Sequence, residues 1–301
     1  TSAVAIFIAQ FYGARNEVRL RESFRFSIIA SYFVILPFFI IAFLFPKEIL
    51  SFFTKDVTLI EAGVTYLRYA CYTFLPIGIS MSISGAMRCI GETKIPLVAS
   101  VISVFINTFL NYCLIFGNFG MPELGVAGAA VATLIARLVE MTLLLIILKF
   151  TDFPFKTRVQ DLFDIDPNLI KQITLKAAPL AMNEILWSAG NAMMLKFYGT
   201  RGGSVLSGNA ICGTFTDIFY TLFSGMSVAT TIMVSQPLGA NELEKAKENG
   251  YRMVGAASIL AFCLSCLMVT TNFIVPILYA SASLEVLTIA KSMIIIQAIC
   301  F

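Results

Sequence analysis

The chain has 301 residues, of which 58% are hydrophobic and 13% are charged, and its mean hydropathy is +0.86. Soluble domains use roughly 45–50% apolar and about 25% charged residues, so this composition indicates a membrane protein. The net charge of +3 is small and suggests no surface for nucleic acid. The chain contains no His, which excludes His-dependent triads, His-ligated haem and most catalytic zinc sites within these residues.

The apolar residues form blocks of about 20, the length that a helix needs to cross a hydrocarbon core of roughly 30 Å. The alternating pattern of an outer-membrane barrel is not seen. The sequence opens on Thr1 with no charged region before the first apolar stretch, so we expect a fragment cut inside a helix at each end. The fold class predicted from these features is an all-α polytopic membrane protein.

In chain order, we expect the end of one helix up to Tyr12 and then spans over 24–45, 62–86, 95–116, 125–148, 173–197, 207–238, 251–279 and 284–301. Lys and Arg concentrate in alternate loops, such as those that hold Arg15, Arg88, Lys149 and Lys245. The opposite loops hold only Lys47, Lys55 and Arg201. The positively charged set should therefore face the cytoplasm.

Residues 149–172 form the longest polar stretch, and we expect them to link an N-terminal lobe over 1–148 to a C-terminal lobe over 173–301. The lobes resemble each other. IFIAQFYGARNE (6–17) matches TIMVSQPLGANE (231–242) when one residue is gapped, and EILSFFTKDVTLIEAG (48–63) matches PILYASASLEVLTIAK (276–291), at offsets of about 226 to 228 residues. Such internal duplication is typical of secondary transporters, whose substrate site lies between the repeats.

Three predicted spans carry polar residues at helical spacing, which places each set in one stripe along its helix. The stripes consist of Ser100, Ser103, Asn107 and Asn111; of Glu184, Trp187, Ser188 and Asn191, after the kink expected at Pro179; and of Thr214, Asp217, Thr221 and Ser224. Together they suggest a common wet interior.

A charge at mid-bilayer costs roughly 2.5–3.5 kcal/mol even on the insertion scale, so Glu184 and Asp217 should face a cavity, a partner or a proton. Desolvation favours the neutral acid, which suits a group that takes up and releases a proton. Other interpretations stay open. The amides of Asn107 and Asn111 could be interhelical hydrogen-bond partners, and Asp217 could pair with a cation, the candidates being Lys196, Arg137 and Lys291. Arg137 could instead neutralise Glu140.

The stretch GAMRCIGETKIPLVASVISVFINTFLNYCLIFGNFGMPELGVAGAAVATLIAR (85–137) resembles the fourth-to-sixth-helix signature of bacterial MATE (multidrug and toxic compound extrusion) transporters. APLAMNEILWSAG (178–190) resembles the start of the seventh helix of that family, and VSQPLGANE (234–242) the end of the eighth. The resemblance implies two pseudo-symmetric six-helix lobes in the full-length protein. This chain would hold helices two to nine and part of the tenth.

The resemblance also implies site residues. An Asn and an acidic residue one turn later on the fifth helix join a Thr on the sixth in the cation site of the family, and these positions match Asn107, Asn111 and Thr133. The second position is Asn111 here, so a site for H⁺ or Na⁺ would lack that carboxylate. Glu184 matches the carboxylate of the C-terminal lobe and is our candidate for ion coupling.

We therefore expect a non-enzymatic antiporter that exports cationic or amphipathic organic compounds in exchange for H⁺ or Na⁺ by alternating access. Glu184 and Asp217, with Trp187 and Asn191, would hold a bulky cation through charge and ring contacts. We expect a monomer in the bilayer of the bacterial cytoplasmic membrane, with no cofactor besides the coupling ion and no metal site apart from Na⁺ near Asn107, Asn111 and Thr133.

Two alternatives remain. A lipid-linked sugar flippase of the same superfamily would require a wide basic cavity, whereas the candidate interior residues are mostly acidic or neutral. An intramembrane thiol oxidoreductase could use the Cys-x-x-Cys pair Cys263 and Cys266. That pair lies in an apolar helix without basic neighbours that would lower a thiol pKa.

Overall fold

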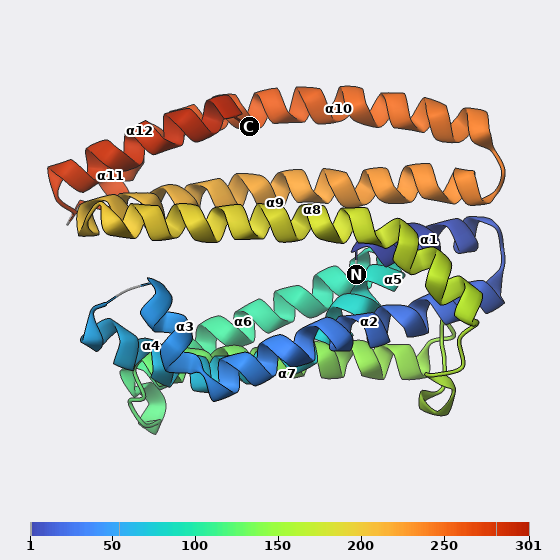
Figure 1. Ribbon diagram of the computed structural model, residues 1–301, viewed down its shortest axis with the longest axis horizontal. Helices are drawn as coiled ribbons and strands as arrows, with labels where there is room; N and C mark the ends of the chain where they lie inside the picture. The colour runs from blue at the N-terminus through green and yellow to red at the C-terminus, as the bar shows by residue number, and fades with distance from the viewer. Residues whose placement is uncertain (1, 54, 281, 301) are drawn as a thin grey trace. The chain divides into compact units, whose positions relative to one another are not determined.

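The computed structural model describes residues 2–53, 55–280 and 282–300, and these residues form α-helices joined by turns and short 3₁₀ segments (Figure 1). The helices are α1 (Ser2–Gly13), α2 (Glu17–Leu44), α3 (Pro46–Phe53), α4 (Val57–Ala70), α5 (Phe74–Cys89), α6 (Lys94–Phe116), α7 (Val126–Phe150), α8 (Pro167–Thr200), α9 (Gly203–Gly239), α10 (Leu243–Thr270), α11 (Val275–Leu278) and α12 (Leu284–Cys300). The 3₁₀ segment Cys71–Thr73 joins α4 to α5. The all-helical prediction is confirmed.

Six helical segments are long and apolar enough to cross a membrane: Glu17–Leu44, Val57–Cys89, Lys94–Phe116, Val126–Phe150, Gly203–Gly239 and Leu243–Phe273. They correspond to six of the predicted spans. The predicted span over 173–197 lies inside the 34-residue helix α8, whose polar side chains leave it outside this set. Pro179 also lies inside α8.

The chain divides into two compact units, Thr1–Ala181 and Met182–Phe301. The boundary falls inside α8, two residues after Pro179, whereas the sequence places the start of the C-terminal lobe at 173. Leu169 and Ile173 of α8 belong to the buried core of the first unit, which explains why the first turns of α8 group with it. The lobe boundaries in the membrane stay a prediction.

Corresponding turns in the two units have the same backbone structure. The turn between α1 and α2 has Arg15 at φ +54°, and the turn between α9 and α10 has Asn241 at φ +62°. Both turns have the same three backbone hydrogen bonds: from Ala14 to Gln10, Arg15 to Tyr12 and Asn16 to Phe11 in the first, and from Ala240 to Gln236, Asn241 to Leu238 and Glu242 to Pro237 in the second.

The following elements also correspond. The helices α2 and α10 both have 28 residues, and each is followed by a short helix and then by a capped longer one. The side chain of Asp56 accepts a hydrogen bond from the N–H of Leu59 at the start of α4, and that of Ser283 accepts one from Val286 at the start of α12. The structure thus contains a repeated α1–α4 and α9–α12 motif. The structure also aligns the segments 6–17 and 231–242 without the predicted one-residue gap. Arg15 and Asn241, which both have positive φ, occupy the same position in the two turns.

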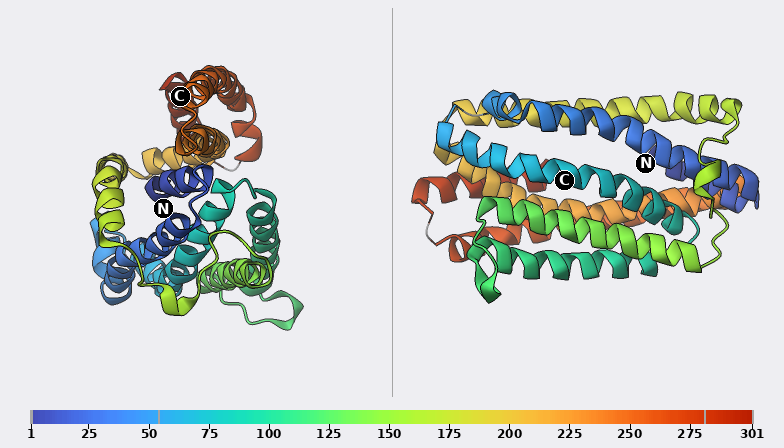
Figure 2. Two further views of the ribbon diagram at one scale, coloured as in Figure 1. Left: turned by 90° about the vertical axis from the view of Figure 1, so that its right-hand side faces the viewer. Right: turned by 90° about the horizontal axis from the view of Figure 1, so that it is seen from below.

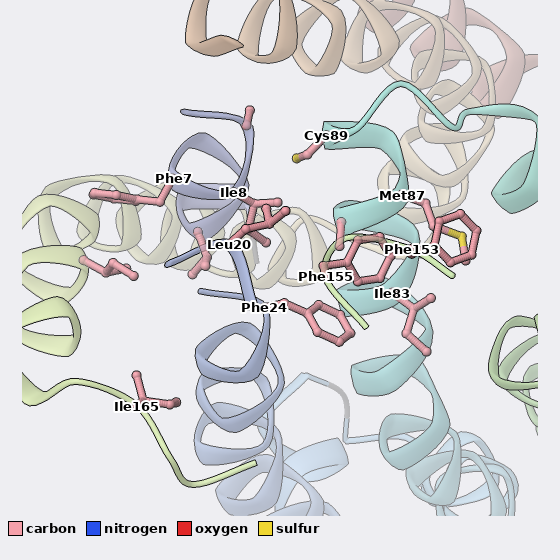
Figure 3. Close-up of a cluster of buried hydrophobic side chains, with 14 of the residues drawn as sticks. Phe7, Ile8, Leu20, Phe24, Ile83, Met87, Cys89, Phe153, Phe155 and Ile165 are labelled. Atoms are coloured by element: carbon pink, nitrogen blue, oxygen red, sulfur yellow. The ribbon is translucent and has the colours of Figure 1, made fainter. Parts of the chain in front are cut away.

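The core of the first unit is built where α1, α2 and α5 meet the segment 151–166, which we call the strap. The side chain of Phe155 is fully buried. The centre of its ring lies 4.8 Å from that of Phe24 and 5.4 Å from that of Phe153. Figure 3 shows both strap phenylalanines beside Phe24 and Ile83. The polar stretch predicted as a linker is therefore packed against the first unit.

Three arginines of α2 hold the strap from outside this core. Arg25 donates to the Thr157 hydroxyl at 2.6 Å and to the Asp164 carbonyl at 2.7 Å. Arg21 donates to the Pro154 carbonyl at 3.2 Å. Arg19 forms an ion pair with Asp166 at 2.7 Å. These arginines follow Arg15 at the end of the predicted span over 24–45 that should face the cytoplasm. The structure gives them a structural role as well.

Serines pack α2 against α5. Ser82 is buried, and its hydroxyl lies 3.4 Å from that of Ser27 and 3.2 Å from that of Ser31. Small side chains of this kind allow membrane helices to approach closely.

The second unit has its own core, in which Gly208 of α9 faces Ile289 and the Val286 carbonyl of α12. Within that unit α9 and α10 form an antiparallel hairpin (Figure 1).

Phe155→Ala should destabilise the protein by about 3 kcal/mol, because it removes a fully buried ring and leaves a cavity. Phe163→Ala is the matched control: Phe163 lies in the same strap but is 81% exposed, so its loss should cost less than about 0.5 kcal/mol. Thermal unfolding in detergent measures both variants. Equal unfolding temperatures would show that the strap is not part of the core.

The ion pair between Arg19 and Asp166 should also make the stability of the protein depend on pH. The backbone N–H of Asn168 and the guanidinium of Arg19 lower the pKa of the Asp166 carboxyl below its ordinary value. A lowered pKa in the folded state stabilises the protein above about pH 4, and this contribution is lost as pH falls through the folded-state pKa. Asp166→Asn should therefore remove part of the acid-induced loss of unfolding temperature. The control Asp152→Asn removes the ion pair of a fully exposed carboxylate with Lys156, which contributes little in water, and should leave that loss nearly unchanged.

Candidate ion and substrate sites

The helices α6 and α7 run side by side and antiparallel (Figure 2, right). Gly128 permits their close approach, since a Cβ at this position would overlap the carbonyl oxygen of Leu114. The αL conformation of Gly117, at φ +69°, ends α6 and turns the chain back. The polar stripe of α6 is thereby placed against α7.

Hydrogen bonds cross this interface at successive turns. The hydroxyl of Ser103 donates to the Ala136 carbonyl at 2.9 Å, and the amide of Asn107 donates to the Thr133 hydroxyl at 3.3 Å. The hydroxyl of Ser100 donates to the Glu140 carboxylate at 2.8 Å. We call this set of bonds the α6–α7 seam. It confirms that Asn107 makes an interhelical hydrogen bond.

Asn107, Asn111 and Thr133 lie together in the seam, and we call them the amide cluster. The Nδ2 of Asn111 donates to the Oδ1 of Asn107 at 3.1 Å. The Thr133 hydroxyl, which accepts from Asn107, donates to the Ala129 carbonyl at 2.8 Å. In this series of hydrogen bonds each donor has an oxygen as its acceptor. One acceptor, at the Asn111 end of the series, receives no hydrogen bond.

That acceptor is the Oδ1 of Asn111, which is buried and has no hydrogen-bond partner among the described residues. A buried polar atom without a partner costs about 1–3 kcal/mol, so this oxygen requires a donor or a cation. Hard cations bind oxygen ligands, and the Thr133 hydroxyl offers a second one. With no carboxylate in the cluster, the donor set suits a monovalent cation such as Na⁺, or a hydrogen-bond donor, better than a divalent ion.

The second predicted stripe lies on α8. Every residue from 178 to 191 is exposed, including Glu184, and Trp187 is 62% exposed. The Nδ2 of Asn191 donates to the Trp187 carbonyl at 3.0 Å. The Glu184 carboxylate takes part in no ion pair or hydrogen bond within the described part of the chain. The stripe therefore presents a charge, a ring and an amide on one helix.

Asp217 lies on an exposed part of α9. The Thr221 hydroxyl donates to its backbone carbonyl at 2.7 Å, and no ion pair of its carboxylate occurs among the residues that the structure describes. Of its proposed cationic partners, Arg137 pairs with Glu140 instead, at 2.7 Å, as the alternative interpretation predicted. The common wet interior of the three stripes stays a prediction, because the α6 stripe lies in the first unit and the α8 and α9 stripes lie in the second.

Sequence reasoning missed the role of Ser100 as a partner of Glu140. The signal that could have found it is the spacing of Thr133, Ala136 and Glu140 on α7, which matches the spacing of the α6 stripe. The two cysteines of the thiol alternative, Cys263 and Cys266, are both free and exposed. No cluster of three His, Cys, Asp or Glu that could hold a metal occurs in the described ranges.

Replacing choline by Na⁺ should raise the unfolding temperature of the protein if the unpaired Asn111 oxygen binds that ion, because a ligand that binds only the folded state stabilises it. Asn111→Ala should remove the Na⁺-dependent part of the increase. Asn118→Ala, in the loop after α6, is the control and should retain it. An increase that is equal in all three proteins would rule out Na⁺ binding at the cluster.

Comparison with known proteins places these features in a family. The family model MatE matches residues 1–113 and 179–301. The chain is 25% identical over 249 residues to the probable multidrug resistance protein YoeA of Bacillus subtilis, with 82% of this chain and 54% of that protein covered. It is 25% identical over 302 residues to the probable multidrug resistance protein NorM of Rhodopseudomonas palustris, covering 99% of this chain and 63% of that one.

Solved structures have the same fold. The eukaryotic MATE transporter AtDTX14 matches with a TM-score of 0.84 at 17% identity, and an outward-facing multidrug resistance MATE transporter with 0.80 at 18%. Each comparison covers 99% of this chain and 65% of the other. The chain thus spans just over half to two thirds of these proteins. Its family model matches well over half of its residues, and the chain belongs to the MatE family of MATE transporters.

Proposed function

We propose that the chain is part of a secondary active antiporter that exports cationic or amphipathic organic compounds in exchange for H⁺ or Na⁺. The names of its relatives, which are probable multidrug resistance proteins, support this substrate class. Membership of a transporter family and the six apolar helices support transport rather than catalysis. The observation that carries the proposal is the carboxylate of Glu184, which has no partner among the described residues and lies three residues from Trp187 on one helix.

The six apolar spans do not include α8, so its crossing of the membrane, as the predicted span over 173–197 has it, is part of this proposal. A carboxylate in a membrane-crossing helix is costly unless it has a partner. Glu140, an acidic residue in the middle of the apolar helix α7, has both a hydroxyl and a guanidinium as partners. Glu184 has neither in the described residues. An exchangeable partner, either a coupling ion or a cationic substrate, would supply the missing charge.

Competition for Glu184 would couple the two movements. A proton or Na⁺ on the carboxylate removes the negative charge that an organic cation needs, and the bound cation in turn excludes the ion. The ring of Trp187 adds an attraction of about 0.5–2 kcal/mol for a cation over its face. Transport follows only if each ligand prefers a different conformation, because a ligand that binds both equally shifts nothing.

The amide cluster would act in the first unit. Its unpaired Asn111 oxygen can accept from a donor or bind a cation without a permanent charge of its own. We assign Asp217 and Asn191 to the substrate surface on the basis of the predicted stripes. We further propose a monomer with two lobes, over 1–148 and 173–301, in the cytoplasmic membrane of a bacterium, with the coupling ion as the only cofactor.

The test is efflux of rhodamine 6G, a fluorescent organic cation, from liposomes that contain the full-length protein. A proton gradient and a sodium gradient are applied separately. Glu184→Gln should reduce the gradient-driven rate by about tenfold or more, since coupling free energies typically correspond to factors of about 5–150. Glu244→Gln, at an exposed carboxylate in the first turn of α10, is the control and should transport at the wild-type rate.

Two results would overturn the proposal. If neither the proton gradient nor the sodium gradient drives export of the dye by the wild-type protein, the protein is not an antiporter of organic cations. Wild-type protein that is driven by a gradient, together with a Glu184→Gln variant that is driven equally well, would retain the antiport and remove Glu184 from it.

A further inference from the structure

The strap, residues 151–166, has two apolar side chains that the first unit leaves uncovered. Val159 is 87% exposed and Phe163 is 81% exposed, although both lie in a polar stretch outside the predicted spans. Val159 is the most exposed large hydrophobic residue in the described part of the chain. Single exposed apolar residues are common on protein surfaces, but two of them on one short segment form a patch that a partner can cover.

Both side chains belong to one compact turn, residues 158–164, which we call the strap turn. The backbone N–H of Asp161 donates to the Arg158 carbonyl at 3.1 Å, and that of Asp164 donates to the Asp161 carbonyl at 3.0 Å. These bonds hold the two apolar residues and the side chain of Arg158, which is also exposed, within the same turn. The strap is thus apolar where it packs into the core of the unit and apolar again where it is exposed.

The attachment of the strap to α2 sets its depth in the membrane. The strap joins α7 to α8 at one end of the helices of the first unit (Figure 2, right). Arg25, in the first turn of the span predicted over 24–45, donates to the Thr157 hydroxyl and to the Asp164 carbonyl. These two residues flank the strap turn on either side. The turn therefore lies level with the end of that span, where the lipid headgroups are, and not far out in the cytoplasm.

The charges at this end of the first unit favour a negatively charged partner. Residues 17–25 and 149–176 contain eight Lys and Arg and six Asp and Glu. All six carboxylates form ion pairs with cations of the same two ranges. The charged residues there that form no ion pair among the described residues are Lys149, Arg158, Lys171 and Lys176. The charge that the protein leaves unpaired is therefore entirely positive.

We propose that the strap turn is a lipid-binding surface, at which Val159 and Phe163 insert into the cytoplasmic leaflet and Arg158 binds the phosphate of an anionic phospholipid. Apolar side chains gain free energy when they leave water for the boundary between headgroups and acyl chains. Lys and Arg beside a membrane span are attracted to the negative surface of the cytoplasmic leaflet. The strap is then held by α2 on one side and by lipid on the other. This binding does not depend on the proposed antiport.

Phe163→Trp in the full-length protein tests the contact with lipid. The variant is reconstituted into vesicles of phosphatidylcholine and phosphatidylglycerol, with or without bromine on the upper part of the acyl chains. Interfacial side chains reach about 5–10 Å into the boundary between headgroups and acyl chains, so bromine should quench most of the emission that the variant adds to the wild-type signal. Glu244→Trp, at an exposed polar residue of the α9–α10 end predicted to face the cytoplasm, is the control and should retain most of its added emission.

Arg158→Gln in the Phe163→Trp background tests the role of the charge. Phosphatidylglycerol, compared with phosphatidylcholine alone, should lower the quenching of the added emission by acrylamide in the water, because an anionic surface draws the turn into the membrane. Arg158→Gln should remove most of this decrease. Lys247→Gln, at an exposed lysine of α10 that forms no ion pair in the described residues, should leave the decrease unchanged.

Three results would overturn the proposal. Bromine that quenches Phe163→Trp no more than Glu244→Trp would show that the turn does not touch lipid. Added emission that neither bromine nor acrylamide quenches would show that a protein segment covers the turn instead. A phosphatidylglycerol effect that Arg158→Gln leaves intact would remove the anionic headgroup from the site. If Phe163→Trp does not fold, Val159→Trp takes its place with the same expected results.

Discussion

The absence of water in a bilayer core governs this structure, because each polar group in an apolar helix must find a partner inside the protein. In the first unit that requirement is met across one helix pair. The α6–α7 seam pairs a hydroxyl with a carboxylate, a hydroxyl with a carbonyl and an amide with a hydroxyl at successive turns. Single bonds of this kind contribute only about 0.6 kcal/mol on average in membranes, so the seam specifies the register of the two helices more than it stabilises them.

Not every polar group is paired: besides Asn111, the hydroxyls of Ser23 and Ser80 and the Oδ1 of Asn272 are buried without a partner among the described residues. Two unpaired acceptors lie on the polar stripes and bear on transport. The Asn111 Oδ1 is buried without a donor, and the Glu184 carboxylate has no cation beside it in the described residues. Both atoms are acceptors, so both would be satisfied by a cation or a proton. The proposed ion-driven exporter would need sites of this type, at which an acceptor gains its partner only while an ion or a substrate is bound. Fully paired polar groups, such as those of Ser82 and Ser103, instead hold helices together.

The sequence predicts the parts of the fold that depend on local pattern. Apolar length predicts the helices, and the spacing from Ser100 to Asn111 predicts the face that meets α7. The repeat is visible in sequence, but its register is not, because only the positive φ of Arg15 and Asn241 shows that no gap is needed. The docking of the strap is also missed. Phe153 and Phe155 are two rings in a polar stretch, and their burial depends on Phe24, which lies about 130 residues earlier.

Of the candidate site, resemblance and spacing predict the amide cluster, since its three members lie on adjacent faces of neighbouring helices. The environment of Glu140 is missed because Arg137, three residues away, offers a sufficient local partner, whereas Ser100 comes from another helix. The α8 stripe is predicted as a pattern only. Helical periodicity indicates which face of α8 is polar, but it does not encode the partners of that face.

Coupling between ion and substrate is reciprocal: if an ion gradient moves the substrate, a substrate gradient must move the ion. The most direct measurement is therefore luminal pH and luminal Na⁺ in liposomes containing the full-length protein, loaded with rhodamine 6G and diluted into dye-free buffer without an ion gradient. The account predicts that outward movement of the dye carries H⁺ or Na⁺ into the lumen, and that Glu184→Gln abolishes this influx. Movement of the dye through the wild-type protein with no change in either ion would contradict it.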